Sequence, residues 1–80
     1  MKIPIIQELV ENQSIEILTR AEMALVAEEP LPIRVGGDDE GEQLIHIIAA
    51  RWILKRMEQE KIDFKGALQE YTRKVKESIS

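Results

Sequence analysis

The side chains best suited to chemistry are one histidine and one cluster of carboxylates. His46 is the sole histidine, and Glu42 lies one helical turn before it, where a carboxylate could orient the ring for acid–base catalysis. The chain has no cysteine, and its serines and threonines follow no nucleophile motif, so the sequence offers no catalytic pair. His46 falls at the edge of an apolar helical face. This pattern favours a half-buried or interface histidine, and we predict no enzyme activity and no catalytic residue.

The carboxylate cluster occupies the turn between Gly36 and Glu42. A calcium site needs oxygen ligands that converge from spaced positions, whereas the consecutive Asp38, Asp39 and Glu40 at a helix start point apart. The glycine pair in this turn could approach a phosphate, but the turn lacks a P-loop lysine and a dinucleotide-binding glycine pattern, and its acids repel anions. We therefore predict no metal and no cofactor, and we assign the acids to helix capping.

The charge balance argues against a nucleic-acid partner. The 80 residues carry 11 Lys and Arg against 15 Asp and Glu, a net charge of −4, which is the wrong sign for binding phosphate backbones. Residues 1–40 hold three basic residues against nine acidic ones, whereas residues 41–80 hold eight against six. Because the basic surplus lies in the last two predicted helices, a nucleic-acid-binding protein that uses their basic face is kept as an alternative.

The sequence predicts neither a secretory signal nor a membrane span. The apolar residues that follow Lys2 are too few for a signal peptide. The richest apolar run, residues 44–54, is too short to cross a bilayer and contains His46 and Arg51. The absence of cysteine is compatible with a reducing compartment, and we predict a cytoplasmic protein without a membrane partner.

The elements that position these side chains are all predicted to be helical. Apolar residues recur at helical spacing over about 4–12, 14–28, 39–60 and 63–79, and the prolines at 30 and 32 indicate a loop over 29–38. The break at residues 12–14 leaves open whether residues 4–28 form two helices or one bent helix. The sequence therefore predicts an all-α fold, a single domain over 1–80 that is a small bundle of three to four helices with a long central helix.

The central helix is apolar on two faces, and both need cover. A chain of 80 residues has a small core, so the second cover is predicted to be another copy of the chain, in a homodimer. One face consists of Leu44, Ile45, Ile48, Ala49 and Trp52. The other, which we predict as the interface, consists of Ile47, Ala50, Ile53, Leu54 and Met57.

Three segments carry a resemblance to known proteins: the opening Met1-Lys2-Ile3-Pro4-Ile5-Ile6, the break at residues 12–14, and the C-terminal half with Glu42-Gln43-Leu44-Ile45, Ala67-Leu68 and Val75-Lys76-Glu77-Ser78-Ile79. With these segments the chain resembles a family of short, all-helical bacterial proteins of unknown function. The resemblance implies the helical fold and brings no activity, cofactor or site residue. The sequence as a whole predicts a non-enzymatic protein–protein interaction module that self-associates. An accessory subunit of an enzyme complex, with an unidentified protein partner, is a further alternative.

Overall fold

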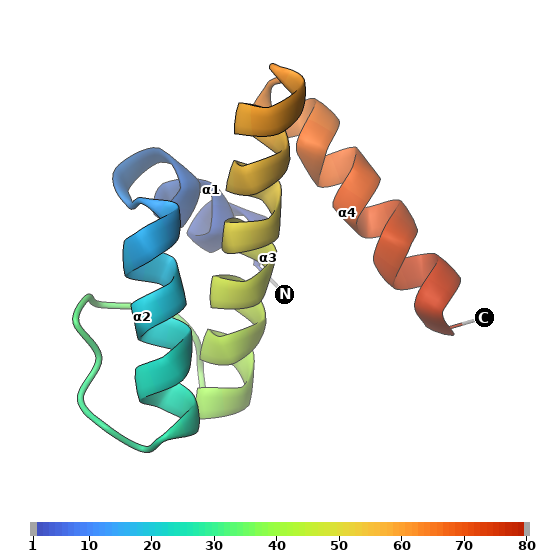
Figure 1. Ribbon diagram of the computed structural model, residues 1–80. Helices are drawn as coiled ribbons and strands as arrows, with labels where there is room; N and C mark the ends of the chain where they lie inside the picture. Colours follow the sequence, from blue (N-terminus) through green and yellow to red (C-terminus); the bar gives the residue numbers. More distant parts are fainter. Residues whose placement is uncertain (1, 80) are drawn as a thin grey trace.

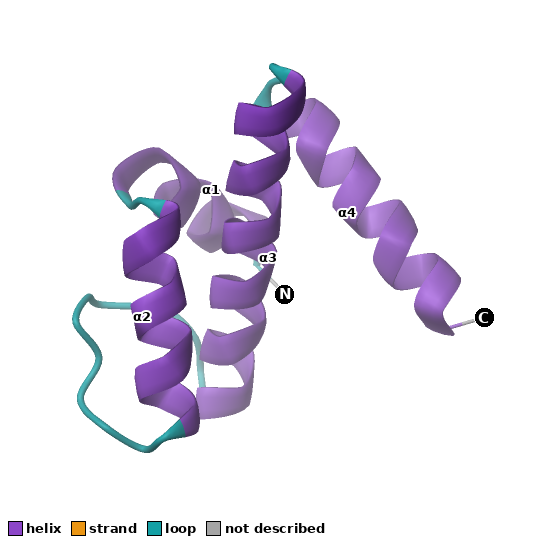
Figure 2. Ribbon diagram, in the orientation of Figure 1, coloured by secondary structure: helices purple, strands orange, loops and turns teal. Residues whose placement is uncertain are grey.

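Four helices make up most of the structure. The computed structural model describes residues 2–79. Helix α1 spans Ile3–Asn12, α2 spans Ile15–Val26, α3 spans Glu40–Glu60 and α4 spans Phe64–Ile79. No strand occurs among the described residues (Figure 2). The predicted all-α fold with a long central helix is confirmed.

Residues 4–28 form two helices, which settles the alternative that the sequence left open. The backbone N–H of Gln13 donates to the Leu9 carbonyl oxygen at 2.9 Å and closes α1. Ser14 then caps α2, because its Oγ accepts a hydrogen bond from the Ile17 N–H at 3.2 Å. The polar break in the sequence thus contains the C-cap of one helix and the N-cap of the next.

Helix α2 ends at Val26, two residues before the predicted boundary. Glu28 adopts the left-handed conformation, with φ of 58°. The N–H of Glu29 donates to the Ala24 carbonyl at 2.8 Å, and the N–H of Glu28 donates to the Leu25 carbonyl at 3.2 Å. This pair of bonds is a Schellman motif, which ordinarily has glycine at the left-handed position. The prolines further along suggested a later end because they were the only visible stop signal.

The connection between α2 and α3 swings out from the end of α2 and returns behind that helix to the start of α3 (Figure 2). Its Val35 side chain is 5% exposed and belongs to the core. Gly36 lies against α1, where an added Cβ would stand 2.9 Å from Ile5 Cδ1. Gly37 has φ of +152°, and an added Cβ would stand 2.9 Å from the backbone nitrogen of Gln43. The two glycines therefore allow the loop to approach both α1 and α3 closely.

Helix α3 is the centre of the fold, and the other three helices all pack against it. In Figure 1, α1 and α2 lie on one flank of α3 and α4 lies on the other. The core combines residues of all four helices with one residue of the loop. Its buried apolar members are Ile6, Leu9, Val10, Leu18, Ala21, Val35, Ile47, Ala49, Ala50, Ile53, Ala67 and Tyr71.

Helix α4 meets α3 near the turn that joins them and then diverges from it (Figure 1). The contact contains an aromatic pair, Trp52 and Tyr71, with ring centroids 5.5 Å apart. Beside it, Arg56 donates to both carboxylate oxygens of Glu70, from Nε at 2.9 Å and from Nη2 at 3.1 Å. An aromatic pair and a bidentate ion pair therefore hold α4 in place near the turn.

The Arg56–Glu70 pair predicts a loss of stability in acid. Hydrogen bonds from the Arg56 guanidinium lower the pKa of the Glu70 carboxyl. The resulting contribution to the free energy of unfolding is present above the ordinary carboxyl pKa of about 4.3, and it is lost as the pH falls through the lowered pKa of the folded state. We expect the urea midpoints of the wild type and Glu70→Gln to differ at neutral pH and to converge in strong acid. Glu58→Gln, which removes an exposed carboxylate, is the control, and an equal gap for both variants would contradict the prediction.

Candidate functional site

The five residues predicted as an interface lie on the face of α3 that the chain itself covers. Ile47, Ala50 and Ile53 are fully buried in the core. Leu54 and Met57 are half-buried and pack against the same cluster. The cover comes from the chain itself, because α1, α2 and α4 all pack against α3 and contribute to the same cluster. A second copy is therefore not needed to bury this face.

The other apolar face of α3 is the one left partly open. Ile45 is 47% exposed, and Leu44, Ile48 and Trp52 are half-buried. Ala49 is the one member of this face that is fully buried. The face predicted as the interface is thus buried within the chain, and the other face is the one left partly open, because the two patterns along the helix are similar and only the placement of the other helices distinguishes them.

Helix α2 exposes two large apolar side chains beside this face. Met23 is 66% exposed and Val26 is 69% exposed. Two surface hollows lie in this area, and they adjoin each other because Arg51 lines both. One hollow has a volume of about 300 Å³ and is lined by Thr19, Ile48, Arg51, Trp52 and Lys55. The other has a volume of about 390 Å³ and is lined by Glu22, Met23, Val26, Ala27 and Arg51. We call Met23, Val26, Ile48 and Trp52, with Arg51 between them, the α2–α3 surface.

The charge in the middle of the α2–α3 surface is balanced within the chain. Arg51 Nη1 lies 2.5 Å from Glu22 Oε1 in an ion pair that joins α3 to α2. Both side chains are partly shielded, with 34% and 23% of their areas exposed. The surface therefore presents apolar side chains around a neutralised pair, which a partner can cover without leaving a lone charge unpaired.

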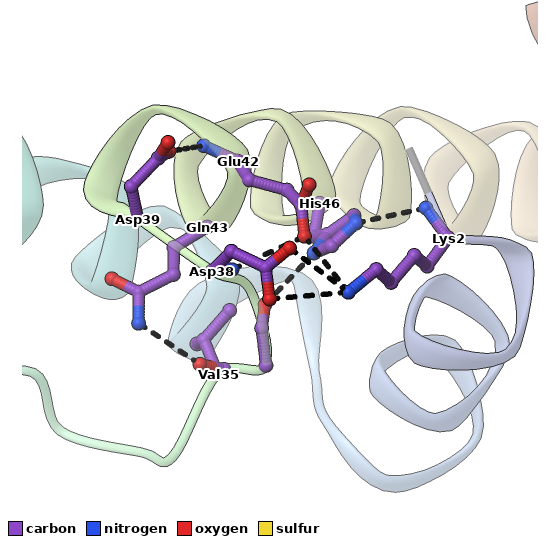
Figure 3. Close-up of polar contacts among 8 residues, drawn as sticks. Lys2, Val35, Asp38, Asp39, Glu42, Gln43 and His46 are labelled. Carbon is purple, nitrogen blue, oxygen red and sulfur yellow. Dashed lines mark hydrogen bonds and ion pairs between the residues drawn. The ribbon is translucent and has the colours of Figure 1, made fainter.

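His46 joins Lys2, the N-cap residue of α1, and the loop to α3 (Figure 3). Its ring is fully buried within the chain, whereas the sequence predicted a half-buried or interface histidine. Nε2 accepts a hydrogen bond from the backbone N–H of Lys2 at 3.0 Å, and Nδ1 lies 2.8 Å from the carbonyl oxygen of Gly36. The neutral ring with its proton on Nδ1 satisfies both contacts. Both nitrogens are thus committed to the backbone, which is a structural role for this histidine.

The carboxylates near His46 bind the Lys2 side chain and cap α3, and Glu42 does not pair with the ring (Figure 3). Lys2 Nζ lies 3.3 Å from Asp38 Oδ1 and 3.5 Å from Glu42 Oε1. The hydrogen bond to Asp38, followed by the charges of both carboxylates, raises the pKa of Lys2. Asp39 Oδ1 accepts from the Glu42 N–H at 2.8 Å and forms the N-cap of α3, as predicted. Within residues 2–79, no three His, Asp or Glu side chains are grouped in a way that could hold a metal ion.

The predicted basic face of the last two helices is interrupted by ion pairs. Arg51 is engaged by Glu22, and Arg56 is engaged by Glu60 and Glu70. These contacts neutralise two of the cations that a nucleic-acid surface would use. As for membranes, no helix within the described residues has both the length and the apolar character needed to cross a bilayer.

Sequence reasoning missed Met23 and Val26 as candidate surface residues. Both lie outside the main apolar stripe of α2, whose members include the buried Leu18 and Ala21. The available signal for an exposed apolar surface was the presence of two large apolar residues outside the buried stripe of the helix. Their spacing of three residues also places them on one side of the helix, which a projection of the sequence would have shown.

The comparisons with known proteins identify a family for the chain and no individual relative. No curated protein and no solved structure matches the chain. A family model, described as a family of unknown function, DUF6952, matches residues 1–80. Because the match covers the whole printed sequence, the chain belongs to this family of unknown function, DUF6952.

Proposed function

We propose that the protein is a small, non-enzymatic protein–protein interaction module that self-associates through the α2–α3 surface. The observation that carries the proposal is the exposure of Met23 and Val26, at 66% and 69%, beside the half-buried Ile48 and Trp52. Single exposed apolar residues are ordinary, but adjoining ones around surface hollows are typical of sites that bind another protein.

The proposal assigns no catalysis to the chain. Its sole histidine has both ring nitrogens engaged by backbone groups, so neither is available to exchange a proton with a substrate. The proposal also places the module in the cytoplasm, where a chain without cysteine has no disulfide to lose in reducing conditions.

A second copy is the partner that the size and charge of the chain favour. An 80-residue domain has a small core, and an interface adds buried apolar area that the single chain lacks. The acidic first half and the mildly basic second half can attract each other between two copies. Two-fold pairing would bury the same surface on both copies at once.

Sedimentation equilibrium over a range of concentrations tests the proposal. We expect the wild type to dimerise and Met23→Asp to weaken the dimer by on the order of a hundredfold, because each copy would bury a carboxylate in an apolar interface. Ile3→Asp is the matched control, since Ile3 is 45% exposed but lies on α1. It should leave the dimer intact, and circular dichroism should show that both variants keep their helices.

Two results would overturn the proposal. One is a wild type that remains monomeric at the highest concentration reached. The other is a dimer that Ile3→Asp weakens as much as Met23→Asp does, because that result would remove the α2–α3 surface from the interface.

A further inference from the structure

We infer that two copies pair through antiparallel α3 helices about a two-fold axis at Ile48, and that Lys55 of each copy pairs with Glu40 of the partner subunit. The inference rests on the proposed self-association, and it adds the orientation of the two copies and the contacts that specify it. Three observations along α3 and α2 support it.

The first observation is the symmetry of the open face of α3 about Ile48. Leu44 lies four residues before Ile48 and Trp52 lies four residues after it, and all three are half-buried. Positions four apart share one side of a helix. When two such helices run in opposite directions and cross at Ile48, Trp52 of each copy lies opposite Leu44 of the partner subunit. A large aromatic side chain then meets a smaller aliphatic one at both ends of the contact.

The second observation is the position of Met23. The ion pair between Arg51 and Glu22 places this part of α2 beside α3, one turn from Ile48. Met23 is the next residue and is 66% exposed. An axis at Ile48 therefore brings Met23 of both copies toward each other. Methionine suits such a position, because its flexible thioether adapts to an identical side chain.

The third observation is a pair of opposite charges at matching distances from Ile48. Lys55 lies seven residues after Ile48, and Glu40 lies eight residues before it. At 100° per residue both project from the edge of α3 that also bears Arg51. Both are exposed, and neither forms an ion pair with another described residue. In an antiparallel pair, Lys55 of each copy lies beside Glu40 of the partner subunit, which gives two opposite-charge contacts. In a parallel pair, Lys55 would lie beside Lys55 and Glu40 beside Glu40.

Charge reversal with cross-complementation tests the register. Lys55→Glu alone and Glu40→Lys alone each convert both predicted pairs into like charges, so each should weaken the homodimer by roughly tenfold at low salt. An equimolar mixture of the two variants should restore wild-type affinity, because both pairs in the mixed dimer are then opposite in charge. The double variant Lys55→Glu/Glu40→Lys should also dimerise like the wild type. High salt should reduce all of these differences.

The possible results distinguish a failure of the antiparallel register from a failure of self-association. If the wild type dimerises but the mixture is no tighter than its components, the register is wrong and the self-association stands. If the wild type does not dimerise, both fail. If each single variant weakens the homodimer and both the mixture and the double variant recover, the antiparallel register is supported, because in a parallel pair the single variants would only exchange one like-charge contact for another.

Discussion

Ile53→Asp is expected to unfold the chain at neutral pH. Ile53 is fully buried and is one of the largest fully buried side chains of the core. Leaving an unpaired carboxylate in such a place costs about 3–5 kcal/mol, and losing the buried isoleucine adds about 2 kcal/mol. A domain of 80 residues has about 4–12 kcal/mol of stability in total. The helical signal in circular dichroism should therefore be largely lost at 25 °C, or urea should abolish it at a far lower concentration.

The matched control for this prediction is Ile45→Asp. It makes the same substitution in the same helix at a side chain that is 47% exposed. The new carboxylate keeps its water there, so the variant should retain its helices and most of its stability. A folded, monomeric Ile53→Asp variant from a dimeric wild type would contradict the structure, because it would make Ile53 an interface residue.

His46→Ala is expected to release two segments of the chain at once. The substitution leaves the Lys2 N–H and the Gly36 carbonyl without their partner and opens a cavity where the buried ring was. We expect a loss of roughly 3 kcal/mol in the free energy of unfolding, from urea titration. Hydrogen exchange should also accelerate at the start of α1 and in the loop together, since the ring joins both to α3.

Gln43→Ala is the control for the histidine. Gln43 Nε2 donates one hydrogen bond to the Val35 carbonyl at 3.2 Å, from the same helix to the same loop. Its loss should cost only about 1 kcal/mol and should leave exchange at the start of α1 unchanged. If both variants lose the same stability, His46 does not have the linking role assigned to it.

The helices could be predicted from the sequence because their signals are local. Ser14 and Asp39 cap α2 and α3 as residues of their type ordinarily do, and the apolar spacing follows the helical period. The boundary at Val26 could not be predicted, because Glu28 takes the left-handed conformation that glycine usually marks.

The roles of the two faces of α3 could not be predicted, for a different physical reason. Ile53 and Ile48 belong to similar apolar stripes of one helix, and a single-helix pattern contains no information on where α1 and α2 pack. The same limit applies to His46. Its partners are Lys2, 44 residues earlier, and Gly36, 10 residues earlier, and no local pattern links them.

The contact between α3 and α4 contains the chain's only tryptophan. Its ring faces Tyr71, and the Arg56 guanidinium carbon lies 5.9 Å from the ring centroid. Indole emission depends on nearby charge and on contact with water, and α4 acts on both here, through Tyr71 beside the ring and Glu70 bound to Arg56. The protein thus contains its own optical probe at the place where α4 joins the bundle. Movement of α4 can be followed in the unmodified chain, without attaching a dye.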